Sequence, residues 1–234
     1  MRKLLMSGGI LLLTGSMILV FSLCTVTEGN GMTAPDGERI QLPEPRHESP
    51  VSLEETLLER RSVRSYQDEP LSLSEASQLL WAAQGITEPA RGFRTAPSAG
   101  ALFPLETFLV VRRTEGLSPG VYRYLPGSHE LELVQAGDIS DALTAAALRQ
   151  AFVRQAAANI VLAGVYARTA GRYGDRAVRY VHMEAGHVGQ NVALQAVALG
   201  LGTVMVGAFQ DDEVARVVGM AAEEEPLYII PVGR

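Results

Sequence analysis

The sequence predicts an α+β domain, because helical and strand patterns are both present but do not alternate as regular strand–helix–strand units. The longest helical pattern covers residues 174–202, where valines and alanines recur at helical spacing. Three strand-like runs, 105–113, 120–126 and 130–135, follow one another without a helix between them. Residues 158–167 are almost continuously apolar, which is typical of a strand buried on both faces.

Local signals predict the other elements. Residues 52–61 indicate a short helix with leucines on one face and acidic residues in its first turn. A second helix is expected over 70–86, where Ser72 and Glu75 have capping-box spacing and Gly85 suits the C-terminal end. The remaining predicted elements are a helix over 138–150, a strand over 203–209, a helix over 211–219 and a final strand over 226–234.

Composition and charge limit the classes of function. The chain has 234 residues, of which 47% are hydrophobic, and this suffices for one packed domain. Its formal net charge of −6 argues against nucleic acid as a partner, because binding to a phosphate backbone needs a basic surface. Lys3 is the only lysine, which excludes Schiff-base chemistry and a P-loop lysine from the folded domain. Any anion site must therefore be local and built from arginines.

The N-terminus predicts a separate segment. Residues 1–26 begin with two basic residues and continue without charge, which fits either a signal peptide or a membrane anchor that places the domain outside the cytoplasm. Cys24 is the only cysteine, so no internal disulfide is possible, and its lipidation stays open. Residues 27–50 are rich in Gly, Pro and charge and are expected to form a linker, so that the domain covers 51–234.

Positive charge gathers at "RRSVR". Arg60, Arg61 and Arg64, together with the hydroxyl of Ser62, could surround a phosphate, because a guanidinium grips phosphate in two places. The alternative is a solvated basic helix end, which is favourable beside the C-terminal end of the helix dipole.

A second candidate binding segment is the loop "APSAGALFP", which precedes the strand predicted over residues 105–113. Pro97, Ser98, Ala99 and Gly100 are small, so the backbone could approach a flat ligand closely; the alternative is an ordinary surface loop. Ser98 is no serine nucleophile, because the chain lacks both G-x-S-x-G and the lysine of S-x-x-K.

These motifs together resemble the FMN-dependent nitroreductase family, and within it the branch of SagB-type dehydrogenases. The resemblance runs from about Leu53 to Arg234 and is carried by "RRSVRSY", "APSAGALFPLE" followed by "VYRY", "EAGHVGQNVALQAVALGLGT" and "PLYIIPVGR". It implies a nitroreductase-like FMN-binding domain with a mixed or antiparallel central sheet flanked by helices. It also implies an intertwined homodimer with two FMN sites at the interface.

The resemblance also implies roles for particular residues. FMN would be bound at its phosphate, ribityl chain and pyrimidine edge by Arg60, Arg61, Ser62 and Arg64, and at its phosphate also by Arg234. The isoalloxazine would be lined by Pro97, Ser98, Ala99 and Gly100 of the partner subunit, and its N5 side by the backbone of Val206, Gly207 and Ala208. Family members often use a lysine at the flavin N1/O2 edge; here Arg61 or Arg64 must serve. No metal site is expected, because His182 and His187 are five residues apart and lie on different faces of the long helix.

The function expected from the resemblance is an oxidoreductase in which FMN passes hydride or electrons in alternating half-reactions. Either a modified-peptide dehydrogenase or a small-molecule nitroreductase using NAD(P)H is compatible with these residues. The flavin is expected to carry the chemistry, so no residue of the protein is expected to be catalytic. The alternative is a membrane-tethered ligand-binding protein that keeps the fold but has no redox turnover.

Overall fold

The computed structural model describes residues 37–234, so the predicted leader over residues 1–26 lies outside the described part. A seven-stranded sheet runs through this part in the order β1-β6-β5-β4-β7-β9-β8, and each neighbouring pair is antiparallel. The strands are β1 (Arg39–Gln41), β4 (Leu105–Val111), β5 (Gly120–Leu125), β6 (Glu130–Ala136), β7 (Ala158–Gly164), β8 (Gly202–Thr203) and β9 (Glu225–Gly233).

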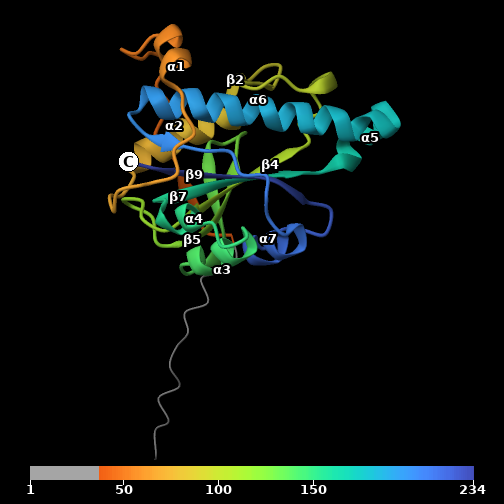
Figure 1. Ribbon diagram of the computed structural model, residues 1–234. Helices are drawn as coiled ribbons and strands as arrows, with labels where there is room; N and C mark the ends of the chain where they lie inside the picture. The colour runs from red at the N-terminus through yellow and green to blue at the C-terminus, as the bar shows by residue number, and fades with distance from the viewer. Residues whose placement is uncertain (1–36) are drawn as a thin grey trace, which may run out of the picture. The chain divides into compact units, whose positions relative to one another are not determined.

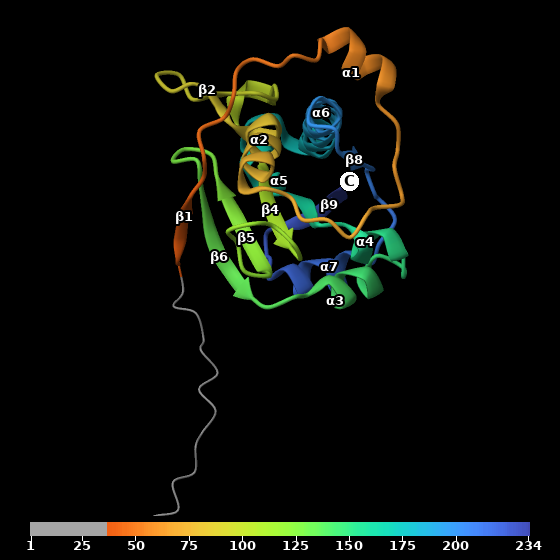
Figure 2. The same cartoon turned by 90° about the vertical axis from the view of Figure 1, so that its left-hand side faces the viewer.

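Helices cover both faces of this sheet (Figures 1 and 2). One face carries α1 (Leu53–Glu59), α2 (Leu73–Gln84), α5 (Tyr166–Tyr173) and α6 (Ala177–Ala198). The other face carries α3 (Ser140–Ala146), α4 (Ala151–Gln155) and α7 (Asp211–Val218). The predicted α+β class, with helices flanking a central sheet, is therefore confirmed.

The central strands contribute to a hydrophobic core on each face. In β4, Leu109 and Val111 pack in the core beneath α2 and α6, whereas Phe108 and Val110 pack in the core above α3 and α7. Successive side chains of a strand point to opposite faces, and both faces are covered, so the sequence of β4 is apolar without alternation. Full burial of each such side chain contributes about 1.5–3 kcal/mol relative to exposure.

The capping signals predicted for α2 are confirmed, whereas α6 begins later than predicted. The Ser72 hydroxyl accepts a hydrogen bond from the Glu75 N–H, and the Glu75 carboxylate accepts one from the Ser72 N–H, which completes the capping box. The long helix begins at Ala177 rather than at residue 174, because residues Gly174–Arg176 form a turn of 3₁₀ helix.

The folded domain begins before Val51, which corrects the boundary expected for the linker. β1 pairs with β6 inside the predicted linker, and Leu42 directly after it is buried. Gln78 of α2 then holds the backbone of Arg46 in both directions, accepting from its N–H at 2.7 Å and donating to its carbonyl at 3.0 Å. A strand of three residues at a sheet edge carries too short an alternation to stand out in a segment rich in proline and charge.

Several further elements differ from the prediction. The loop after α2 contains a small hairpin of β2 (Ile86–Glu88) and β3 (Phe93–Arg94). Neither α4 nor α5 was expected, and α5 begins at Tyr166, where the sequence predicts the end of a strand. The strand predicted over 203–209 ends at Thr203, and only Val206 rejoins the sheet, through a bridge to Ile229. Among the described residues, no helix is both long and apolar enough to cross a membrane.

Candidate functional site

The arginine segment, residues 60–64, follows α1 and lies against the end of the sheet formed by β8 and β9. Ser62 forms a parallel bridge with Thr203, and the Val63 N–H donates to the Thr203 carbonyl at 3.0 Å. Tyr66 fixes the next turn, because its hydroxyl donates to the Val63 carbonyl at 2.8 Å and lies 3.2 Å from that of Pro231. Burial raises the pKa of Tyr66, against a smaller lowering effect of Arg64, so the phenol keeps its donor proton.

Two glycines permit this close approach. A Cβ at Gly202 would lie 2.8 Å from Cγ1 of Val63, and a Cβ at Gly233 would lie 3.0 Å from Cδ1 of Tyr66. Both distances are shorter than ordinary carbon–carbon contact at about 3.5–4.0 Å. The glycines of "GLGT" and "PVGR" are therefore needed for packing the arginine segment onto the sheet.

The three arginines of this segment differ in what their side chains contact. Arg61 is exposed, but its guanidinium donates to the carbonyls of Leu58 and Arg60 at 2.8 Å each and thereby satisfies the end of α1. Arg60 is half-buried and Arg64 is exposed. Within residues 37–234, no carboxylate lies within ion-pair distance of any of the three. Their positive charge is thus available to an anionic ligand.

Arg234, by contrast, is engaged with acidic residues. Its guanidinium pairs with Glu75 of the α2 capping box, donates to the Pro70 carbonyl at 2.7 Å, and lies 3.9 Å from Glu69. The terminal arginine lies beside the same end of the sheet as the arginine segment, but its charge is largely balanced by these two carboxylates.

The segment after β8 presents backbone donors at two of the three predicted positions. The Val206 N–H donates to the Ile229 carbonyl at 2.8 Å, and the Val206 side chain is buried. Gly207 and Ala208 are exposed, and their N–H groups have no backbone acceptor in the part of the chain that the structure describes. Only Gly207 and Ala208 therefore retain free backbone donors for a ligand.

The small-residue loop, residues 97–100, forms a second cluster. Gly100 has φ = +64°, and a Cβ there would lie 2.9 Å from the Tyr173 hydroxyl and 3.0 Å from Nη1 of Arg172. The Ser98 hydroxyl accepts the Phe103 N–H at 2.9 Å, which closes the loop on itself. Arg172 and Tyr173 were missed by sequence reasoning because their contact with Gly100 spans some seventy residues of chain.

Buried polar side chains support this loop from below. Glu184 of α6 is 2% exposed and Gln84 of α2 is 0% exposed. Arg94 of β3 donates from Nη1 to the Gln84 side-chain oxygen at 2.9 Å. At the start of the loop, Asn191 of α6 donates to the Thr95 carbonyl at 3.2 Å. Sequence reasoning considered Glu184 only as a metal ligand together with His182 and His187, and did not place it near this loop.

Within one chain the two clusters lie toward opposite ends of α6. The arginine segment pairs with β8, just beyond the C-terminal end of α6, whereas the small-residue loop lies by its N-terminal half and by α5 (Figure 1). At 1.5 Å per residue, the 22 residues of α6 span about 33 Å. The structure therefore brings residues 60–64 and 234 to the end of the sheet at β8 and β9, whereas Gly207 and Ala208 follow β8 toward α3 and α4. Separately, it brings residues 97–100 together with α5 and α6.

The residues of the first cluster fit FMN. Unpaired guanidinium groups and a serine hydroxyl match a phosphate, and the exposed N–H groups of Gly207 and Ala208 match the acceptor edge of a flat ring. In residues 37–234, no three His, Cys, Asp or Glu side chains are grouped so that they could hold a metal ion. His182 lies 2.7 Å from the Tyr166 hydroxyl through its Nε2, which gives it a local partner.

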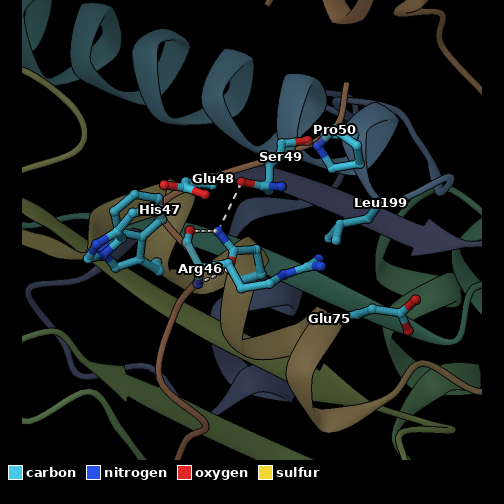
Figure 3. A pocket seen from close by; sticks show the side chains of 11 residues that line it. Arg46, His47, Glu48, Ser49, Pro50, Glu75 and Leu199 are labelled. Atoms are coloured by element: carbon cyan, nitrogen blue, oxygen red, sulfur yellow. Dashed lines mark hydrogen bonds between the residues drawn. The ribbon is translucent and has the colours of Figure 1, made fainter. Parts of the chain in front are cut away.

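A pocket of about 330 Å³ lies elsewhere, between the segment 46–50, α2 and the end of α6 (Figure 3). Arg46 extends into it toward Glu75 and Leu199, and the ring of His47 packs on Trp81 with centroids 5.2 Å apart. Its lining includes none of the residues predicted to bind FMN, and it touches that cluster only through Glu75, the partner of Arg234.

Comparison with known proteins identifies the family. The model of the nitroreductase family matches residues 57–234. A Methanocaldococcus jannaschii protein named as a nitroreductase is 47% identical over 199 residues, which are 85% of this chain and 98% of that protein. A Ralstonia eutropha crystal structure with a nitroreductase description superimposes with a TM-score of 0.74 at 31% identity, covering 84% of this chain and 89% of that chain.

A third likeness concerns the fold. The Escherichia coli microcin synthetase McbBCD complex, solved with truncated pro-MccB17 bound, contains a chain with a TM-score of 0.65 at 24% identity, covering 94% of this chain and 84% of that one. Together with the family match over residues 57–234 and the antiparallel sheet flanked by helices, these likenesses lead to one conclusion. The chain belongs to the nitroreductase family, whose members are in general flavin-dependent oxidoreductases.

Proposed function

We propose that this chain is an FMN-dependent oxidoreductase of the SagB-type branch. Two observations carry the proposal. The arginine segment presents cationic side chains without acidic partners against β8, and the segment after β8 presents free backbone N–H groups at Gly207 and Ala208. When bound, FMN supplies the redox chemistry, accepting a hydride equivalent and gathering negative charge at its N1/O2 edge.

The contacts of the arginines suggest which part of FMN each of them binds. Arg60 and Ser62 hold the phosphate and ribityl chain, while Arg64 provides the cation at the electron-rich edge. Arg61 is the weaker candidate for that edge, because its guanidinium already donates to two carbonyls at the end of α1. Arg234 contributes to the phosphate only by sharing its guanidinium with Glu75.

A homodimer completes the site. In a two-fold dimer with antiparallel α6 helices, the N-terminal half of one α6 lies beside the C-terminal half of the other. The small-residue loop of one subunit then faces the arginine segment of its partner, which one chain alone does not achieve. Leucines of α1 are strongly exposed for a single chain, Leu53 at 60%, Leu57 at 53% and Leu58 at 72%, and would be covered in such a dimer.

The substrate is a small molecule or a modified peptide that exchanges hydride or electrons with FMN in alternating half-reactions. The likeness in fold to the microcin synthetase complex supports the peptide alternative. In the nitroreductase direction, NAD(P)H would be the electron donor. The N-terminal segment, in which an uncharged apolar run follows Arg2 and Lys3, supports a membrane-anchored or exported location, where an envelope donor would replace NAD(P)H.

Flavin binding is tested with the full chain purified in mild detergent, by its visible absorption spectrum and by the release of FMN on denaturation. Arg64→Gln should weaken FMN binding about tenfold to a hundredfold, because hydrogen bonds to charged groups contribute about 1.5–3 kcal/mol. Arg61→Gln is the matched control and should have a smaller effect. Fluorescence titration with FMN measures both affinities, and sedimentation velocity measures the dimer.

The outcomes distinguish the oxidoreductase from a ligand-binding protein without redox turnover. A flavin spectrum that is bleached by a chemical reductant supports the oxidoreductase. A colourless protein that does not bind added FMN would refute it and leave the ligand-binding alternative without redox turnover. Equal losses of affinity in the Arg61 and Arg64 variants would contradict the assignment of Arg64 to the flavin edge.

A further inference from the structure

Glu184 is a buried carboxyl group directly beneath the small-residue loop. It is 2% exposed, and in the part of the chain that the structure describes its Oε1 has no hydrogen-bond partner. Burying an unpaired carboxylate oxygen is costly, so such groups are uncommon outside functional sites.

The residues around Glu184 form a polar cluster. The Gln84 side chain accepts a hydrogen bond from Arg94 through its oxygen, while its Nε2, like Nε of Arg94, has no partner among residues 37–234. The Arg94 guanidinium lies 4.4 Å from the ring centroid of Phe103. Phe103 donates its N–H to the Ser98 hydroxyl, whose own proton is then available to the neighbouring Glu184 carboxyl. These contacts join α2, β3 and the loop around the buried carboxyl group of α6.

The charges around Glu184 set its proton equilibrium. Burial raises its pKa, whereas Ser98, Gln84, Arg94 and His187 lower it by smaller amounts. Arg94 in turn lies in the field of Glu106, Arg168 and Tyr124. Glu184 therefore changes from neutral to charged at a higher pH than an ordinary glutamate.

We propose that Glu184 is a positioning residue of the flavin site, whose negative charge, held behind Ser98 and the small-residue loop, lowers the reduction potential of the flavin bound there. The inference rests on the proposed function, because that loop lines the isoalloxazine only if FMN binds as proposed. It concerns a group that neither binds the phosphate nor contacts the solvent.

The physical basis is electrostatic. A two-electron reduction leaves extra negative charge on the flavin, and a fixed negative charge in a buried, low-dielectric setting opposes it. A single charge at about 10 Å, with an effective dielectric constant of about 20, changes such an equilibrium about tenfold. For a two-electron couple, a tenfold change corresponds to about 30 mV.

The test is Glu184→Gln in the full chain, which keeps the size and hydrogen-bonding capacity of the side chain and removes the charge. The readout is the midpoint potential of bound FMN, measured by equilibration with a reference dye across a pH series. At low pH, where Glu184 is protonated, variant and wild type should agree. As the pH rises and Glu184 ionises, the wild-type potential should fall below that of the variant by about 30 mV.

Two further variants keep the test decisive. Glu184→Asp retains a titrating carboxyl and should keep the pH-dependent difference from Glu184→Gln. Glu224→Gln removes another buried carboxyl, one that pairs with Arg123, and should leave the potential unchanged. Circular dichroism establishes that each variant is folded.

The possible failures are distinguishable. If wild type binds no flavin, the proposed function fails and the inference falls with it. If wild type binds flavin and the potentials of wild type and Glu184→Gln coincide at every pH, only the role of Glu184 is overturned. A difference that is constant with pH would also overturn it, because the effect would then not follow ionisation.

Discussion

The approach of the arginine segment to Gly202 allows one prediction to be worked out from the structure. In Gly202→Ala, the new Cβ would lie 2.8 Å from Cγ1 and 2.9 Å from Cβ of Val63. Gly202 does not have a positive φ, so alanine fits the backbone and the cost comes from the collision alone. Overpacking of this kind costs about 1–3 kcal/mol. For a domain of this size, 2 kcal/mol corresponds to a fall in Tm of about 4–8 °C.

The assay is a double-mutant cycle, measured by urea denaturation of wild type, both single variants and the double variant. Val63→Ala removes Cγ1 and Cγ2 but keeps the Cβ at 2.9 Å, so the double variant should recover part of the cost, a coupling energy of about 1 kcal/mol. Gly207→Ala is the control, because its Cβ would meet nothing closer than Tyr228 Cε1 at 3.8 Å, and we expect a change within about 0.5 kcal/mol. If Gly202→Ala is as stable as wild type, or if Val63→Ala does not relieve its defect, the packing argument is refuted.

Three further predictions concern stability. The free energy of unfolding of wild type should fall as the pH rises through the raised pKa of Glu184, because folding favours the protonated form of its carboxyl group. Glu184→Gln should lose this dependence on pH. If urea denaturation gives wild type and Glu184→Gln the same dependence from about pH 4 to 7, this prediction is wrong. Tyr66→Phe leaves the Val63 carbonyl without its donor and should lower the free energy of unfolding by about 0.5–1.5 kcal/mol, and an unchanged urea midpoint would show that water replaces the hydroxyl. In Gly171→Ala the new Cβ meets nothing within 4 Å, so α5 should gain about 0.5–1 kcal/mol, observable as a raised Tm.

The sheet and main helices could be predicted because their signals are local and agree with burial. β4 and β7 are apolar throughout since both their faces are covered, and α2 carries its capping box in four consecutive residues. β1 could not be predicted, because its stability comes from pairing with β6, some ninety residues away. α5 was hidden because the apolar run of β7 continues into its first residues.

The candidate site shows the same division between local and distant information. The arginine segment and the small-residue loop stand out by composition, so residues such as Arg64 and Ser98 could be selected from the sequence. The contacts that these side chains make could not be predicted from the sequence. The capping of α1 by Arg61 depends on the conformation of one side chain, and the pairing of Arg234 with Glu75 joins residues 159 positions apart.

The placement of the two clusters at opposite ends of α6 has a thermodynamic consequence for the proposed enzyme. If FMN contacts the arginine segment of one subunit and the small-residue loop of the other, it binds the dimer in preference to the single chain. Ligand binding and association are then linked, and FMN stabilises the dimer by as much as dimerisation strengthens FMN binding. A change in the loop, such as at Gly100, would weaken the site of the partner while leaving its own arginine segment intact. Composite sites of this kind couple each cofactor to both chains, which explains why no single chain needs to form a closed flavin pocket of its own.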